Sequence, residues 1–150
     1  IYNDPEAADT VFSSGLAIKM IGLDVTHKVF LSDNDVLKLS LMDNRSGKFL
    51  KKISNFYINF YRETKNMDGC FFHDATAVIA FTNPELFEFK KGKVFVSKDD
   101  LTRGQTVVFD RHREHETLPA DDRKNINIAN DVNSEKVICE FLEIAKNHMT

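Results

Sequence analysis

The sequence predicts an α/β fold, and three observations support this class. An amphipathic helical segment near the start is followed by a nearly continuous apolar run, which makes one helix-strand repeat. Further helical segments occupy the middle of the chain, and short β-like segments with a closing helix occupy the last third. The 150 residues include 42% hydrophobic and 29% charged residues, a mixture typical of one globular domain with a sizeable core.

The first predicted element is a helix from about Asp4 to Gly15. Asp4 can cap the first turn, Pro5 suits the first helical position, and Gly15 favours the end of the helix. The segment from Leu16 to Val25 is almost entirely apolar and contains β-branched isoleucines, which favours a buried strand. A helix followed by a buried strand is expected in an α/β sheet.

Two more helices are predicted next. Ser32 can cap a short helix from Asp33 to about Met42, which ends in a polar break. The segment from Lys48 to Thr64 is predicted as a long helix, because apolar residues recur along it at helical spacing. We expect this apolar stripe to face the core; its members are Phe49, Ile53, Phe56 and Phe60.

An apolar helix is predicted from Ala75 to Phe81, after His73-Asp74 and before Asn83-Pro84, which ends it. The last third of the chain predicts a small antiparallel or mixed sheet closed by an amphipathic helix, because polar breaks separate its β-like segments. These elements are strands over 93–97, 106–110 and 125–130 and a helix over 134–148.

Charge and composition argue against several classes of function. The chain carries 20 basic and 23 acidic side chains, a net charge of -3, and no Lys/Arg block, so we expect no nucleic-acid partner. No apolar run approaches the roughly 18 residues of a membrane span, so we expect no membrane partner. Cys70 and Cys139 form no CxxC motif and favour buried thiols in a reducing, cytoplasmic compartment.

One of the five histidines is placed where acid/base chemistry is expected. His73 and Asp74 follow the apolar segment 70–72 at a loop-to-helix junction, where aromatic walls can shift the pKa values of a titratable pair. The alternative is that Asp74 only caps the helix and His73 is its partly exposed neighbour. We expect the other four histidines to be solvated, because their surroundings are polar. The spacing of His112 and His115 matches no established zinc site.

Two tyrosines lie one helical turn apart in the predicted long helix. Tyr57 and Tyr61 therefore project from the same face. Core packing is the usual reason for such a pair, but Phe56 and Phe60 form a neighbouring stripe and are the better core candidates. The tyrosines, with their polar tips, are then candidates to line a wet cleft and stack on a flat heterocycle.

Four segments together resemble the inosine-uridine-preferring nucleoside hydrolase family. They occur in the order of that family's motifs and extend along nearly the whole chain. Each is moderately specific, and the four together are a strong match. They are Asp4-Pro5-Glu6-Ala7-Ala8 with Val11-Phe12 and Ser14-Gly15, then Met20-Ile21-Gly22-Leu23-Asp24-Val25-Thr26-His27, then His73-Asp74 with Ala77-Val78 and Asn83-Pro84, and finally Thr102-Arg103-Gly104-Gln105-Thr106-Val107-Val108.

The resemblance implies a fold, a function and partners for the intact protein. The fold is the C-terminal portion of the family's open sheet flanked by helices, with a small extra β region. The implied function is Ca²⁺-dependent hydrolysis of the N-glycosidic bond of ribonucleosides to ribose and free base, in purine or pyrimidine salvage. The implied partners are a small-molecule nucleoside and further copies of the protein, in a homodimer or homotetramer.

The resemblance also implies roles for four residues. Asp74 matches a carboxylate ligand of the bound Ca²⁺, an ion that prefers oxygen ligands. His73 matches the general acid that lies over the base and protonates it as it leaves. Tyr61, with Tyr57 nearby, matches aromatic positions on the mobile helix that closes over the nucleobase. Tyr57, Tyr61 and His73 are thus the implied substrate-binding residues.

Two motifs of the family do not occur in this chain. They are the N-terminal D-x-D-x-G-x-D-D cluster, which builds most of the metal site, and the E-F-N tripeptide that grips the ribose. We therefore expect residues 1–150 to be the C-terminal part of a nucleoside hydrolase domain, inactive without its metal-binding N-terminal half. Two alternatives are a non-catalytic remnant that serves as a binding or structural module, and a generic α/β domain with coincidental motifs.

Overall fold

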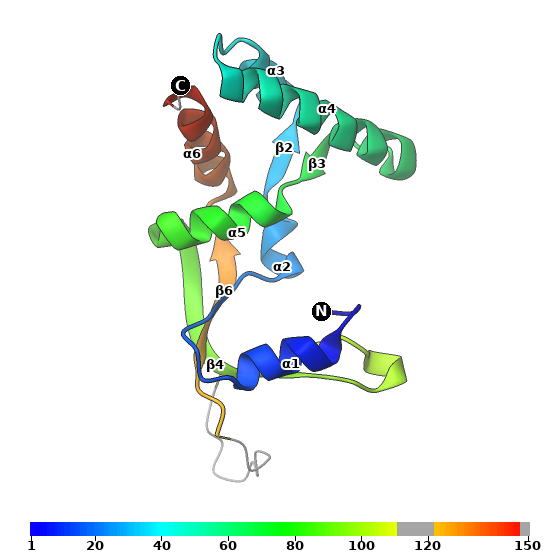
Figure 1. The fold of residues 1–150 in the computed structure, drawn as a ribbon, viewed down its shortest axis with the longest axis vertical. Coiled ribbons are helices and arrows are strands. Elements are labelled where there is room, and N and C mark those ends of the chain that lie inside the picture. The colour runs from blue at the N-terminus through cyan, green and yellow to red at the C-terminus, as the bar shows by residue number, and fades with distance from the viewer. Residues whose placement is uncertain (111–121, 148–150) are drawn as a thin grey trace. The chain divides into compact units, whose positions relative to one another are not determined.

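The computed structural model describes residues 1–110 and 122–147, whose helices and strands are drawn in Figure 1. The chain divides into two compact units, and each unit is made of two separate stretches of sequence. The boundaries fall within the strands β4 (Phe87–Val96) and β6 (Ile126–Val132), so both units contain parts of these strands. Among the described residues, unit 1 contains 1–20, 89–110 and 122–129, and unit 2 contains 21–88 and 130–147.

The described part of unit 1 combines one α-helix with a mixed four-stranded sheet in the order β1-β6-β4-β5. β1 and β6 pair in parallel, whereas β4 and β5 pair antiparallel. The core of the unit consists of Val94, Ile126 and Ile128, against which Phe12 and Met20 pack. The elements are α1 (Pro5–Ser13), β1 (Lys19–Met20), β4 (Phe87–Val96), a 3₁₀ turn η2 (Asp100–Thr102), β5 (Thr106–Phe109) and β6 (Ile126–Val132).

The helix and strands predicted for unit 1 are confirmed, although β4 begins at Phe87, six residues before the predicted start, but the prediction for the apolar run is not confirmed. Asp4 caps α1 through a 2.9 Å hydrogen bond that its carboxylate accepts from the Ala7 amide. The predicted strand from Leu16 to Val25 is wrong: only Lys19–Met20 is a strand, and residues 23–26 form a helix. Leu16 is 66% exposed. An apolar run of this length does not by itself distinguish a strand from a helical turn, because both bury apolar residues.

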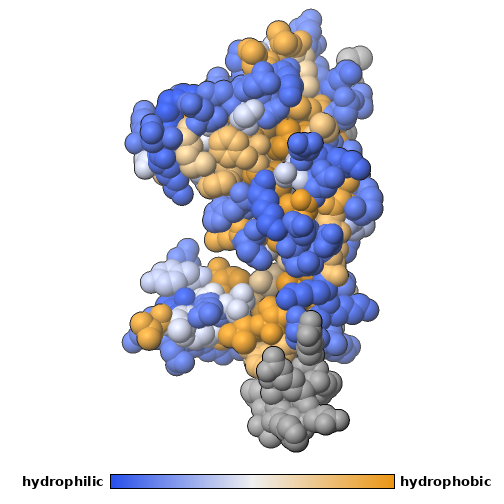
Figure 2. All heavy atoms as spheres, turned by 180° about the vertical axis from the view of Figure 1, so that it is seen from behind, coloured by the Kyte–Doolittle hydropathy of each residue, from blue (hydrophilic) through white to orange (hydrophobic). Residues whose placement is uncertain are grey.

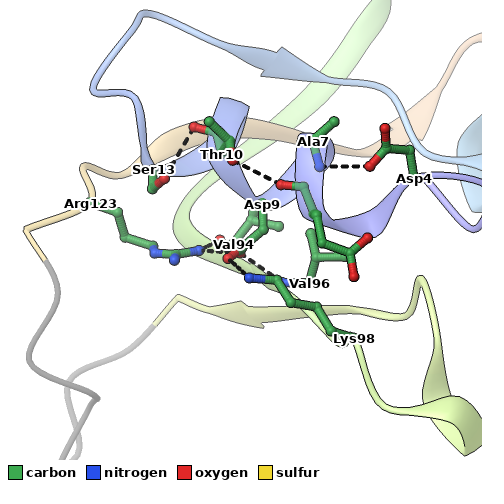
Figure 3. Close-up of polar contacts among 10 residues, drawn as sticks. Asp4, Ala7, Asp9, Thr10, Ser13, Val94, Val96, Lys98 and Arg123 are labelled. Carbon is green, nitrogen blue, oxygen red and sulfur yellow. Dashed lines mark hydrogen bonds and ion pairs between the residues drawn. The ribbon is translucent and has the colours of Figure 1, made fainter.

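A cluster of charged side chains joins α1 to the sheet of unit 1 (Figure 3). We call it the Asp9 cluster: the Asp9 carboxylate accepts hydrogen bonds from Arg123 (3.0 Å), Lys98 (2.9 Å) and the Val96 amide (3.3 Å). Burial alone would raise the pKa of Asp9, but these hydrogen bonds outweigh it and lower the pKa to about 2. Arg123 also donates to the Val94 carbonyl. The cluster therefore stabilises unit 1.

Within residues 21–88 and 130–147, unit 2 contains five α-helices and a two-stranded antiparallel sheet, β2-β3. α4 packs on α3, β3 and α6, and Figure 1 shows α3 and α4 side by side. Gly69 has φ +149°, and a Cβ there would lie 2.5 Å from the Leu31 carbonyl oxygen, so the close pairing of β3 with β2 requires glycine. The elements are α2 (Leu23–Thr26), β2 (Phe30–Ser32), α3 (Asp33–Ser40), α4 (Arg45–Lys65), β3 (Gly69–Phe71), α5 (His73–Thr82), a 3₁₀ turn η1 (Pro84–Leu86) and α6 (Ser134–Asn147).

The helices predicted for unit 2 are confirmed, while its two short strands were not predicted. Ser32 caps α3 in a capping box with Asp35. Asn44 caps α4 by accepting a 2.6 Å hydrogen bond from the Gly47 amide, and the helix begins at Arg45, three residues before the predicted start. The histidines His112, His115 and His148 lie outside the described residues. Of the described helices, none is both long enough and apolar enough to cross a lipid bilayer.

The prediction for the apolar stripe of α4 is wrong, because the opposite face is buried. The buried residues are Gly47, Ile58 and Tyr61. Figure 2 shows apolar side chains, in orange, reaching the surface of this unit. Helical spacing shows which residues share a face, but not which of two apolar faces meets the core. The exposed members of the stripe are Phe49 (60%), Ile53 (47%), Phe56 (80%) and Phe60 (51%).

Candidate functional site

His73 lies at the junction where β3 ends and α5 begins. As the first residue of α5, it is half-buried, and its imidazole Nδ1 lies 2.7 Å from the hydroxyl oxygen of Thr26 in α2. The ring of His27 lies edge-on to that of His73, with centroids 5.3 Å apart, and the Phe71 ring lies 6.0 Å away. The junction and these neighbours hold the imidazole in one place.

The surroundings of His73 favour its neutral form. Burial lowers the pKa of His73 below its ordinary value, and the nearby His27 and Lys65 lower it further, while Asp74 acts in the opposite direction. The imidazole therefore takes up a second proton less readily than a fully solvated histidine does. Such dependence on the local charge is common for histidines that exchange protons with a ligand.

Asp74 occupies the first turn of α5 without capping it. The N-cap residue is Phe72, and no side chain makes a capping hydrogen bond there. The interpretation of Asp74 as a simple helix cap is therefore wrong. Its side chain is exposed, and it lines the same groove as His73. A carboxylate at a helix N-terminus is stabilised by the helix dipole.

A groove of about 520 Å³ runs between α4, β3 and the start of α5 in unit 2. It contains three of the four residues singled out from the sequence: Tyr57, His73 and Asp74. Another hollow of unit 2, of about 380 Å³, lies between α3 and α6 and contains none of them. The groove is lined by Leu31, Ile53, Ser54, Phe56, Tyr57, Cys70, Phe71, Phe72, His73, Asp74 and Ala75.

The two tyrosines of α4 differ in their exposure. Tyr57 is 41% exposed and lines the groove, whereas Tyr61 is 5% exposed and lies behind it. Their rings meet edge-on with centroids 5.1 Å apart. Burial and a hydrogen bond with Tyr57 raise the pKa of Tyr61 to about 12. The expectation of an exposed tyrosine pair is therefore correct for Tyr57 only, and a substrate-binding role of Tyr61 stays a prediction.

Comparison with known proteins identifies the family of the chain. The model of the family described as "Inosine-uridine preferring nucleoside hydrolase" matches residues 1–138. The chain belongs to this family. The interpretation of a generic α/β domain with coincidental motifs is therefore wrong, and the family resemblance of the four sequence segments is confirmed.

Several nucleoside hydrolases are similar to this chain. "Probable uridine nucleosidase 1" of Oryza sativa subsp. japonica is 37% identical over 72% of this chain and 33% of its own length. "Pyrimidine-specific ribonucleoside hydrolase RihA" of Shewanella woodyi is 36% identical over 72% of this chain and 35% of its own length. "Probable uridine nucleosidase 2" of Arabidopsis thaliana is 30% identical over 92% of this chain and 43% of its own length.

Solved structures of nucleoside hydrolases confirm the predicted fold class. A plant nucleoside hydrolase matches with a TM-score of 0.88 at 30% identity, over 97% of this chain and 46% of that one. A purine-preferring ribonucleoside hydrolase from Gardnerella vaginalis matches with a TM-score of 0.79 at 31% identity, over 95% of this chain and 45% of that one. The chain thus spans less than half the length of these relatives.

The described part of this nucleoside hydrolase chain does not form a metal site by itself. Within it, no three His, Cys, Asp or Glu side chains lie close enough together to hold an ion. Asp74 offers one carboxylate to the groove, whereas a hard cation such as Ca²⁺ needs about six to eight oxygen ligands. The donor set of residues 1–110 and 122–147 is therefore incomplete for such an ion.

Three residues near the site had no role in the sequence analysis. Thr26 and His27 lie in a segment that resembles the family, and this was the only sign of their importance in the sequence. Their contacts with His73 could not be predicted, because they join positions far apart in the sequence. His27 is exposed as expected, yet its ring packs 4.6 Å from that of Phe71. Cys70 is buried as expected, and burial raises the pKa of its thiol to about 11, but Cys139 is exposed.

Proposed function

We propose that this chain provides the base-facing part of a ribonucleoside hydrolase active site. The proposed reaction cleaves the N-glycosidic bond with water and releases ribose and the free base. The observation that supports it is the groove of unit 2, in which Tyr57, His73 and Asp74 lie together. Membership of the nucleoside hydrolase family supports it independently.

His73 is proposed to act as the general acid. When the bond between the sugar carbon and the base nitrogen breaks, its electron pair goes to the base, and a proton from His73 neutralises the charge that develops there. The sugar carbon gains the oxygen of a water molecule, as in other glycoside hydrolysis. The second proton of this water is taken up by a base that lies outside this chain.

Tyr57 is proposed to contact the face of the nucleobase. Its ring is partly exposed and lines the groove together with the apolar side chains of Phe56 and Ile53. Tyr61 lies behind Tyr57, edge-on to both Tyr57 and Phe71, and is proposed to hold the Tyr57 ring in place. This arrangement suits purine and pyrimidine rings alike, because stacking does not require particular base edges.

Asp74 is proposed to contribute one ligand of a Ca²⁺ site. The other oxygen ligands and the ribose-binding groups are proposed to come from a part of the domain that this chain does not contain, since the solved relatives are about twice as long. We also propose that the intact protein is a homodimer or homotetramer. When bound, such an ion would orient the sugar and make the attacking water more acidic.

Replacing His73 in the complete protein tests the proposed function. We expect His73→Ala to lower kcat for inosine and uridine by about 10²- to 10⁴-fold, the range typical of general acid-base catalysis. Cleavage of p-nitrophenyl β-D-ribofuranoside, whose leaving group needs no proton, should fall much less. Unchanged turnover of the nucleosides by His73→Ala would sink the proposal. Binding of nucleosides without any turnover by the unaltered protein would favour a non-catalytic binding module instead.

Calorimetric titration of the complete protein with Ca²⁺ tests the role of Asp74. We expect Asp74→Ala to weaken binding strongly, because the replacement removes a charged oxygen ligand. The matched control is Asp43→Ala, which removes an equally charged side chain that is 95% exposed and lies away from the groove. Equal Ca²⁺ affinity of both variants would contradict the assignment.

A further inference from the structure

We propose that Thr26 is a positioning residue for His73, whose hydroxyl keeps the imidazole oriented so that Nε2 faces the ligand. This inference rests on the proposed function of His73 as the general acid. It assigns a role to the family-like segment 20–27, for which the sequence analysis gave none. Thr26 itself touches no reacting atom in this scheme.

The contact between Thr26 and His73 is short and protected from water. Thr26 Oγ1 lies 2.7 Å from His73 Nδ1, and Thr26 is 3% exposed. α2, which ends at Thr26, packs against α5, which begins at His73. A buried hydroxyl needs a hydrogen-bond partner, and the imidazole nitrogen is the partner that the structure provides for it. The hydrogen bond therefore links two helices through residues that lie 47 positions apart in the chain.

Other helical threonines in the described chain use their hydroxyls differently. The hydroxyls of Thr10, Thr64 and Thr76 donate to a carbonyl oxygen four residues earlier, in the same helix or at its N-cap. This local bond is the common choice for threonine in a helix. Thr26 has the corresponding carbonyl at Gly22, which already accepts from its backbone amide, but its hydroxyl reaches His73 instead. This difference supports a specific role of the Thr26 hydroxyl in orienting the imidazole.

A hydroxyl suits this position because it can donate or accept a hydrogen bond. When both ring nitrogens carry protons, Nδ1–H donates to Thr26 Oγ1 and Nε2–H faces the ligand. After Nε2 gives its proton to the base nitrogen, Nδ1–H still donates to the same oxygen, so the ring need not turn. When the only proton is on Nε2, the hydroxyl rotates and donates to Nδ1. The rings of His27 and Phe71 limit sideways movement of the imidazole meanwhile.

The kinetics of two variants of the complete protein test the proposal. Thr26→Val keeps the shape of the side chain but removes the hydroxyl, whereas Thr26→Ser keeps the hydroxyl. For Thr26→Val we expect kcat with inosine to fall about tenfold or more with little change in KM, since a hydrogen bond to a charged group is lost. Cleavage of p-nitrophenyl β-D-ribofuranoside should stay close to normal, and Thr26→Ser should restore turnover of inosine.

Thr82→Val is the matched control in the same part of unit 2. Thr82 ends α5, the helix that begins at His73, and its hydroxyl donates to the Ile79 carbonyl at 3.3 Å, so the loss of this hydroxyl should alter neither reaction. A purely structural role of Thr26 would lower both reactions equally, and this result would overturn the proposal. Normal turnover of inosine by Thr26→Val, or no rescue by Thr26→Ser, would overturn it as well. If Thr26→Val does not fold, Thr26→Ala makes the same comparison.

The outcome of His73→Ala separates this inference from the proposed function. If His73→Ala has normal turnover, the proposed function fails and the role of Thr26 fails with it. If His73→Ala is nearly inactive on inosine while Thr26→Val is fully active, only the inference about Thr26 fails. The two ideas are therefore distinguished by one set of assays.

Discussion

The Asp9 cluster of unit 1 and the His73 site of unit 2 are both built around a titratable side chain, but their surroundings differ. In the Asp9 cluster, the carboxylate is surrounded by donors from the chain itself, and Arg123 is buried with its guanidinium 3.9 Å over the Phe95 ring. At the His73 site, Thr26 engages one ring nitrogen and an open groove lies beside the imidazole. A polar cluster whose bonds are satisfied internally stabilises a fold, whereas one that faces a groove can serve a ligand.

Removing Arg123 gives the largest expected effect on stability. We expect Arg123→Ala to lower the free energy of unfolding by about 3 kcal/mol, because Asp9 then loses its buried partner. Lys98→Ala should cost at most about 1 kcal/mol, since Lys98 is 49% exposed. Urea denaturation of both variants measures these changes. If His73→Ala destabilised the protein as much as Arg123→Ala, the claim that the Asp9 cluster serves stability and the His73 site serves a ligand would be contradicted.

The Asp9 cluster should also make stability depend on pH in the acid range. Because the pKa of Asp9 is about 2 in the folded protein and its ordinary value is 3.8, the carboxylate stabilises the fold fully above pH 3.8. This contribution, about 2 kcal/mol, is lost as the pH falls through about 2. Unfolding free energies measured from pH 5 down to pH 2 in the normal protein and in Asp9→Asn test this. If the two proteins showed the same pH dependence, Asp9 would not be the group responsible.

A smaller effect is expected within the His73 site from Tyr57→Phe. This variant removes the hydrogen bond between Tyr57 and Tyr61 but keeps the aromatic ring in the groove. We expect the pKa of Tyr61 to fall from about 12 towards its ordinary value of 10, with a stability loss of about 1 kcal/mol. Spectrophotometric titration of the tyrosines measures the shift. An unchanged pKa of Tyr61 would show that burial alone accounts for it.

Local chemistry made most helices of this chain predictable from sequence. Asp4 with Pro5 and Ser32 with its capping box mark helix starts through contacts within three residues, and these marks appear directly in the sequence. The apolar run 16–25 was predicted wrongly, because its burial depends on residues elsewhere in the chain. The pair β2-β3 was also missed, since each strand has three residues and gains its register only from its partner.

The candidate site was predictable in part. His73-Asp74 was recognised by its place before a helix and by family resemblance, and both residues do line the groove. The sequence did not reveal that Tyr57 faces this groove while Tyr61 is buried, or that Phe56 is exposed. α4 carries two apolar faces, and only contacts with α3, β3 and α6 decide which one is buried.

The sequence by itself determined the helix starts, the α/β class, the family and the identity of the His73-Asp74 pair, because these depend on neighbouring residues or on ordered motifs. Only the tertiary structure decided the partner of the imidazole, since Thr26 lies 47 positions away and the chain must fold before the two side chains meet. It also decided that the Asp9 carboxylate accepts hydrogen bonds from donors of the chain itself, because these donors lie 87 to 114 positions away from Asp9 in the sequence.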